Sequence, residues 1–262
     1  MKTLQAHHLK MKRNRRRKRL IFCSVFGFLL VIVLLGYLFL FSPVFKIKKI
    51  EINQTHVLDS IIVQQGVQTI LNQGFILGPL IVGNNILFIP NKQISDYLRS
   101  FSIIEDYTQN KNIFSRVLKI DIQEREIAGI LKQSVAKNYY FDKNGIIFSE
   151  APDIEGEVFP VIESNLNRSF DLGGRILELT SFQELMRMVQ LLDDNFLNTH
   201  VKLGKDKLEI VLILDNNKEM SLYLNFNNFS QTYSVLSYFI QNNFDFNLEY
   251  LDLRYLPNVY YK

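Results

Sequence analysis

An uncharged, strongly apolar run from Leu20 to Phe41 constrains this chain more than any other feature of its sequence. As an α-helix, a run of this length extends roughly 33 Å, which is enough to cross the hydrocarbon core of a bilayer. The residues before it carry nine Lys or Arg and no Asp or Glu, and a flank of this kind stays on the cytoplasmic side. The sequence therefore predicts a basic cytoplasmic tail at 1–19, a membrane helix at 20–42 and an extracytoplasmic remainder.

A cleaved secretory signal is the alternative interpretation of the same run. Signal peptides have an apolar core of about 7–15 residues followed by a small-residue cleavage site. Here the apolar core is longer, and it continues into Ser42-Pro43-Val44-Phe45, where no A-x-A pattern occurs. We therefore expect an uncleaved anchor with the N-terminus in the cytoplasm.

The positive net charge of the chain belongs to the tail. Once the nine tail cations are set aside, 21 Lys and Arg remain against 26 Asp and Glu, so the external part is mildly acidic. Binding to nucleic acid needs a basic surface on the folded part, so we expect no nucleic-acid partner. The only cysteine, Cys23, lies inside the predicted span, which leaves the external part without disulfides.

The external part opens with a pattern that predicts a small β-α-α-β-β unit with both helices on one face of its sheet. Its expected elements are strands at 45–52, 103–107 and 113–123 and helices at 57–71 and 92–101. The first helix is expected to place Leu58, Ile61 and Ile62 on its apolar side, and the polar residues 109–112 are expected to form the turn between the last two strands.

Between these two helices lies an apolar stretch, Gly74–Asn85, that is interrupted by glycine. It is too short and too broken for a second membrane span, so we expect a loop or a lip over the core. A contact with the membrane surface and a docking site are the alternatives for this stretch.

The rest of the chain predicts a second unit with a mostly antiparallel sheet and flanking helices, which makes the external part α+β. The hairpin signal is strongest at Asp142-Lys143-Asn144-Gly145, because Asn-Gly readily adopts the positive φ angles of a tight turn. Helices are expected at 182–196 and 229–241, and strands at 126–132, 138–142, 207–214, 220–225, 248–256 and 258–262.

Catalytic and metal-binding patterns are missing from the sequence. No G-x-S-x-G, H-E-x-x-H, Walker-type or G-x-G-x-x-G motif occurs, and the external histidines, His56 and His200, lie far apart. Glu124 and Glu126 share a strand face and are interpreted as solvated carboxylates. We therefore expect no enzymatic activity, no metal and no cofactor, and a membrane-tethered cell-wall hydrolase is the weaker alternative.

Four stretches, in this order behind the membrane anchor, resemble the bacterial cell-division family FtsQ/DivIB. FKIKKIEI (45–52) is similar to the opening strand of that family's POTRA domain, and SRVLKIDIQEREIAGIL (115–131) to its last strand and the Glu-Arg junction that follows. YYFDKNGIIF (139–148) resembles the hairpin that opens the family's β domain. YLDLRYLPNVYYK (250–262) resembles the closing Asp-Leu-Arg strand.

The resemblance implies a POTRA domain at 43–124 and a β domain at 125–262. It further implies a non-catalytic, single-pass scaffold of the divisome at the division septum. Such a scaffold binds small bitopic division proteins of the FtsB/DivIC and FtsL types, and so links early and late assembly of septal peptidoglycan synthesis. Other divisome proteins are expected to bind through the POTRA domain.

The partner-binding site is expected at a sheet edge formed by the C-terminal strand, because an edge strand offers N–H and C=O groups to an added strand. Tyrosines supply rigid amphipathic contact area at interfaces. The resemblance adds Arg254 and Tyr255, which match family positions near the partner-binding surface. Arg254 is expected to pair with a partner carboxylate or with Asp252. The predicted partner-binding residues are Arg254, Tyr255, Asn258, Val259, Tyr260 and Tyr261. A buried terminal strand is the alternative.

A different interaction protein is the second functional hypothesis. A POTRA-bearing, membrane-anchored adaptor of secretion or envelope assembly would share the anchor and the first unit. The chain has neither tandem POTRA repeats nor a barrel-like series of strands, so the divisome scaffold is the preferred reading.

Overall fold

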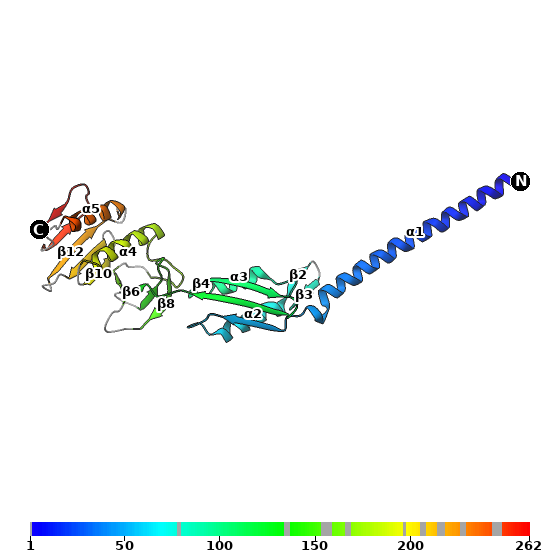
Figure 1. Cartoon of the computed structure of the whole chain (residues 1–262), viewed down its shortest axis with the longest axis horizontal. Coiled ribbons are helices and arrows are strands. Elements are labelled where there is room, and N and C mark those ends of the chain that lie inside the picture. The colour runs from blue at the N-terminus through cyan, green and yellow to red at the C-terminus, as the bar shows by residue number, and fades with distance from the viewer. Residues whose placement is uncertain are drawn as a thin grey trace. The chain divides into compact units, whose positions relative to one another are not determined.

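The chain is α+β, with one N-terminal apolar helix and a large mixed sheet, in a computed structural model that describes residues 2–77, 80–133, 137–152, 159–165, 169–195, 198–204, 208–213, 218–225, 229–242 and 248–262 (Figure 1). It divides into two compact units. The first unit comprises Met1–Ser100 and Tyr107–Ile122, and the second comprises Phe101–Asp106 and Gln123–Lys262.

Helix α1 (Lys2–Phe41) contains the predicted apolar segment. Its portion Ile21–Phe41 is long and apolar enough to cross a membrane, and its side chains are exposed rather than buried in protein. An exposed apolar surface of this length is stable in lipid and not in water. The prediction of a single apolar helix at this position is confirmed.

The first unit continues with a short sheet whose strand order is β1-β5-β4, with β1 parallel to β5. The 3-10 turn η1 (Pro43–Phe45) precedes the sheet, so the first strand begins later than predicted. The elements are β1 (Lys49–Asn53), α2 (Ser60–Gln73), β2 (Phe75–Leu77), β3 (Leu80–Val82), α3 (Asn91–Arg99), β4 (Ile104–Asn112) and β5 (Val117–Glu124).

Helix α2 buries a different side from the predicted one. Val63, Val67 and Leu71 are fully or almost fully buried, whereas Ile61 and Ile62 are 59% and 53% exposed. The helix begins after its N-cap Asp59, whose carboxylate accepts the N–H of Ile61. Two apolar rows run along this helix, and the row with i, i+4 spacing packs inward.

Two connections in the first unit also differ from prediction. The apolar stretch, for which a loop or a lip over the core is expected, contains the short hairpin β2–β3, of which residues 78–79 lie outside the described residues. Strand β4 extends through the polar residues 109–112, and the turn to β5 lies instead at 113–116, where Arg116 has a φ of 59°. Exposure alternates along the first part of β4, and residues 110–112 are all exposed, so these polar residues extend the strand without packing against the core.

The second unit is built on a sheet of nine described strands in the order β14-β13-β12-β11-β10-β9-β6-β7-β8. The pairs β6–β9, β9–β10 and β12–β13 are parallel, and the other five are antiparallel. The strands are β6 (Gly129–Gln133), β7 (Asn138–Phe141), β8 (Ile147–Ala151), β9 (Val161–Ser164), β10 (Asn198–Leu203), β11 (Leu208–Ile213), β12 (Glu219–Leu224), β13 (Tyr250–Asp252) and β14 (Tyr260–Tyr261).

Helices α4 (Leu179–Asp193) and α5 (Phe229–Gln241) contribute to the core of the second unit with alternate residues of these strands. Leu208, Ile210 and Leu212 of β11 point into this core, while Glu209 lies on the other face. Both helices were predicted, α5 with its observed bounds. Strands β9 and β10 were missed.

The predicted hairpin turn at Asp142–Gly145 is confirmed. Gly145 has a φ of 71°, and a Cβ at this position would lie 2.7 Å from the ring of Phe182. Only glycine fits both the backbone conformation and the close approach of α4. The turn therefore fixes β8 directly against the helix layer.

Candidate functional site

Strand β14 forms one end of the nine-stranded sheet. It pairs with β13 in antiparallel fashion, with Leu251 opposite Tyr261 and Asp252 opposite Tyr260. Glu249 N–H donates to the Lys262 carbonyl at 2.7 Å, and Lys262 N–H donates to the Tyr250 carbonyl at 3.3 Å. Within the described residues, no strand borders β14 on its other side. The margin predicted to accept a partner strand is therefore at a sheet edge.

The opposite end of the sheet, at β8, is covered by the chain itself. The Ile147 N–H donates to the Gly174 carbonyl at 2.9 Å, and the Gly173 N–H donates to the Ile147 carbonyl at 2.7 Å. Farther along the strand, the Ser102 hydroxyl donates to the Phe148 carbonyl at 2.8 Å. Edge strands covered in this way are protected from pairing with another chain, so β14 is the better candidate for strand addition.

Next to β14, Arg254 forms a two-point ion pair with Asp252. Its Nε donates to Oδ1 at 2.9 Å and its Nη2 donates to Oδ2 at 2.6 Å, and its backbone N–H also donates to Oδ1 at 3.1 Å. The Asp252 side chain is 9% exposed and that of Arg254 is 32% exposed. A fork-to-fork pair of this kind fixes the plane of the guanidinium.

The fixed guanidinium organises an aromatic cluster. Its Cζ lies 5.4 Å from the ring centroid of Tyr223 and 5.3 Å from that of Tyr255, which are cation–π distances. The Tyr255 ring meets Tyr260 edge-to-face at 6.2 Å, and Tyr223 meets Tyr250 at 6.1 Å. We call Tyr223, Tyr250, Arg254, Tyr255 and Tyr260 the tyrosine platform.

The structure brings the predicted site residues to one sheet margin, where they have different environments. Tyr255, Tyr260 and Tyr261 are 58%, 54% and 61% exposed, and Asn258 is exposed and donates its N–H to the Tyr255 carbonyl. Val259 is partly buried and packs against the core.

Arg254 is engaged within the chain by Asp252, one of the two pairings expected for it. Because Asp252 is buried, this is not an exposed pair on a sheet face. Arg254 therefore holds the tyrosines in place, with its remaining N–H donors at a partly exposed position.

Tyr223 and Tyr250 belong to the cluster and were not predicted. They come together because β12 and β13 are parallel, with Ser221 opposite Tyr250 and Tyr223 opposite Asp252. The alternation of buried and half-buried residues along β12 places Tyr223 on the face away from the core, and that alternation is visible in the sequence. The pairing of β12 with β13, which brings Tyr250 beside Tyr223, cannot be predicted from that alternation.

The ion pair predicts a pH dependence of stability. Burial raises the pKa of Asp252, but the hydrogen bonds from the side chain and backbone of Arg254 outweigh it, so the pKa lies below its ordinary value. A carboxylate with a lowered pKa stabilises the fold above its unfolded pKa of about 4, and this contribution is lost as the pH falls through the folded value. In urea unfolding at about pH 7 and about pH 3, wild type should lose more stability between the two conditions than Asp252→Asn. Equal losses would contradict the proposed role of the pair.

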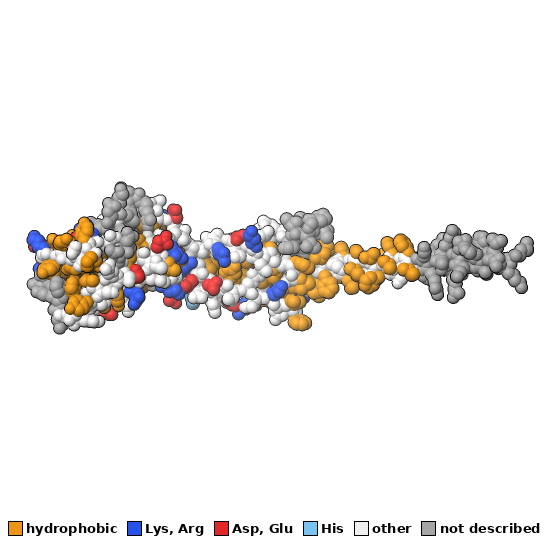
Figure 2. Space-filling model, turned by 90° about the horizontal axis from the view of Figure 1, so that it is seen from above, with side chains coloured by type: hydrophobic (Ala, Val, Ile, Leu, Met, Phe, Trp, Pro, Cys, Tyr) orange, Lys and Arg blue, Asp and Glu red, His pale blue; other side chains and the backbone are white. Residues whose placement is uncertain are grey.

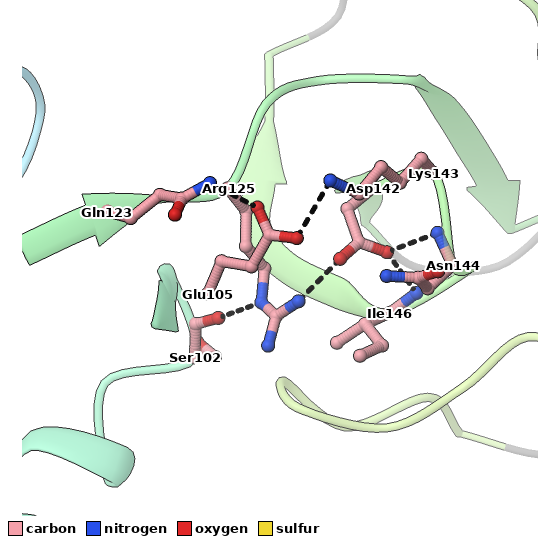
Figure 3. Close-up of polar contacts among 8 residues, drawn as sticks. All are labelled: Ser102, Glu105, Gln123, Arg125, Asp142, Lys143, Asn144 and Ile146. Atoms are coloured by element: carbon pink, nitrogen blue, oxygen red, sulfur yellow. Dashed lines mark hydrogen bonds and ion pairs between the residues drawn. The ribbon is translucent and has the colours of Figure 1, made fainter. Parts of the chain in front are cut away.

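A second cluster of charged groups lies at the hairpin turn (Figure 3). Arg125 forms an ion pair with Asp142, and the two side chains are 13% and 3% exposed, respectively. The Nε of Arg125 also donates to the Ser102 carbonyl at 2.9 Å. The other oxygen of Asp142 accepts the N–H groups of Asn144 and Ile146, both at 2.9 Å. The Asp142 carboxylate therefore connects the Glu-Arg segment to the turn, which is a structural role.

Metal and ligand sites are not evident elsewhere in the described part of the chain. No group of three or more His, Cys, Asp or Glu within it could hold a metal ion. An open groove beside α4 is lined by none of the predicted site residues; its lining is Lys143, Pro160, Gln183, Met186, Arg187, Val189, Gln190 and Asp193. No protein-family model matches the chain, and no curated protein matches it.

Proposed function

We propose that this chain is a single-pass scaffold of the bacterial divisome, of the FtsQ/DivIB type, that binds small bitopic division proteins of the FtsB/DivIC and FtsL types at strand β14. One observation carries the proposal: the last described strand stands at a sheet edge and presents exposed tyrosines. The apolar helix α1 supplies a membrane anchor for such a scaffold. The four family-like stretches support the interpretation of the first unit as a POTRA domain and of the second as a β domain.

The proposed binding mode is strand addition. A partner segment lies along the outer side of β14 and forms main-chain hydrogen bonds, since alternate residues of an edge strand direct N–H and C=O groups away from the sheet. The Tyr255 and Tyr260 rings lie beside that segment. The cation–π contact of Arg254 with Tyr255 and the edge-to-face contact of Tyr255 with Tyr260 hold the two rings in place. Main-chain pairing supplies affinity, and the tyrosine platform supplies selectivity for an apolar or aromatic side chain.

The partner segment orders when it binds, and this ordering has an energetic cost. The loss of backbone entropy, about 1–2 kcal/mol per residue, offsets much of the gain from burial and hydrogen bonding. A platform that is rigid before binding reduces the cost on the scaffold side. The ion pair between Asp252 and Arg254 is the feature that makes it rigid.

Localisation in dividing cells tests the function itself. A fluorescent fusion of the full chain should gather at midcell, and removal of residues 258–262 should release a co-expressed bitopic partner from midcell. A fusion with Tyr238→Ser, which alters an exposed tyrosine of α5, serves as the matched control and should retain the partner. A uniform peripheral signal from the full-length fusion would refute the divisome assignment.

A further inference from the structure

The end of helix α1 is fastened to the body of the first unit. The side-chain amide of Asn85 donates to the carbonyls of Phe39 and Leu40, both at 3.0 Å, and Asn85 is 2% exposed. The last carbonyls of a helix have no partner within it, so this amide caps the membrane helix. Phe39 also stacks on Phe45 with ring centroids 5.3 Å apart. The first unit is thus held directly at the point where α1 ends.

The turn between β4 and β5 lies at this same point. Arg116 donates its Nη1 to the Pro43 carbonyl at 3.2 Å, and its own carbonyl accepts the Lys48 N–H at 2.8 Å. Pro43 follows the last residue of α1 by two positions, so the turn stands within reach of a bilayer that α1 crosses.

Large apolar side chains at this point are exposed. Phe114, in the turn, is 100% exposed, Ile113 is 41% exposed, and Val44 in the neighbouring 3-10 turn is 63% exposed. A phenylalanine that is fully exposed to water loses the favourable free energy that burial of its ring would provide. We call these three residues the apolar tip. Figure 2 shows the hydrophobic surface of α1 continuing onto the adjoining end of the first unit.

Basic side chains outnumber acidic ones near the apolar tip. The segments 42–50 and 110–119 carry no Asp or Glu, and 74–90 carries no charged residue at all. The first two segments contain six cations. Lys49 pairs with Glu51 at 2.9 Å and Lys119 pairs with Asp121 at 3.0 Å, which leaves Lys46, Lys48, Lys111 and Arg116 as the cations of the surround. An apolar tip within a basic surround is the pattern that binds the interface of an anionic bilayer.

We infer that the apolar tip docks onto the outer surface of the membrane that α1 crosses, with Phe114 entering the boundary between headgroups and acyl chains and the surrounding cations facing anionic headgroups. This inference rests on the membrane anchor of the proposed function and not on strand addition at β14. Docking would add a second contact to the Asn85 cap and hold the first unit against the bilayer.

Fluorescence from a single label tests the inference on the full chain in vesicles. Cys23 is replaced by Ser, and an environment-sensitive fluorophore is attached to Phe114→Cys after reconstitution into phosphatidylcholine–phosphatidylglycerol vesicles. The matched control is Val57→Cys, which is also an exposed apolar residue of the first unit but follows β1 at the end away from α1. The label at position 114 should shift to shorter wavelength and lose most of its emission to brominated lipid, and the label at 57 should do neither.

Two further arms separate the outcomes. A label on native Cys23, inside the apolar segment, should be quenched by brominated lipid if α1 spans the bilayer. Quenching at 23 with a water-like signal at 114 would overturn docking alone, whereas no quenching at 23 would overturn the anchor and with it both proposals. Vesicles of phosphatidylcholine alone should reduce the shift at 114, and an unchanged shift would refute the role of the cations.

Discussion

Replacing both Tyr255 and Tyr260 with Ser should abolish capture of the bitopic partner's ectodomain while leaving the fold intact. Tyrosines at the centre of an interface typically contribute about 2 kcal/mol or more each, so the double change should weaken binding on the order of 10²- to 10³-fold. Both side chains are more than half exposed, so their loss removes little from the core. Binding measured with the partner ectodomain, together with urea unfolding, checks both parts of this prediction.

The control for this experiment is Tyr238→Ser. Tyr238 is 63% exposed and belongs to α5 rather than to the tyrosine platform. The Tyr238→Ser variant should bind the partner with the same affinity as the wild type. Equal weakening by the control and the double variant would show a general surface effect, and unchanged binding by the double variant would exclude the platform from the interface.

Replacing Arg125 with Met should destabilise the second unit strongly. The substitution leaves the Asp142 carboxylate, 3% exposed, without its guanidinium partner, and it removes the donor to the Ser102 carbonyl. Removing one member of a buried pair typically costs about 3–5 kcal/mol because the remaining charge is left without compensation. Pulse proteolysis of the full chain in increasing urea should report this loss at about neutral pH.

A double-mutant cycle distinguishes a lost charge pair from a lost side-chain volume. Asp142→Asn removes the charge but keeps an oxygen for the N–H groups of Asn144 and Ile146. The double variant Arg125→Met, Asp142→Asn should therefore be more stable than Arg125→Met alone. Lys143→Met removes the ion pair of a lysine that is 68% exposed with Glu105, and it should have a much smaller effect than Arg125→Met. Additive losses in the cycle would mean that the two residues do not act as a pair.

Local patterns predicted the elements whose signals are contained in a few neighbouring residues. Helix α5 begins and ends where its periodicity predicts, and the Asn-Gly turn after Asp142 forms as expected. Helix α2 shows the limit of this reasoning, because it has apolar residues on two sides, Ile61 and Ile62 outward and the row with Val63, Val67 and Leu71 inward. The inward row is selected by β1 and α3, which lie outside the helix.

The arrangement of the site residues could not be predicted from the sequence, because it depends on strand pairs that are distant in the chain. The parallel pair β12–β13 brings Tyr223 beside Asp252. A local sequence pattern does not predict which distant strand will pair with a given strand. The site residues were predicted as a set because the last strand and its tyrosines are adjacent in sequence. Their mutual arrangement, with Arg254 between two rings, required the sheet order.

Amide hydrogen exchange on the full chain, with and without the partner ectodomain, tests strand addition most directly. The account predicts that backbone amides from Val259 to Lys262 exchange more slowly once the partner is present, while amides of β8 at the covered end of the sheet are unchanged. Protection confined to another surface, with β14 exchanging at its original rate in a saturated complex, would contradict the account.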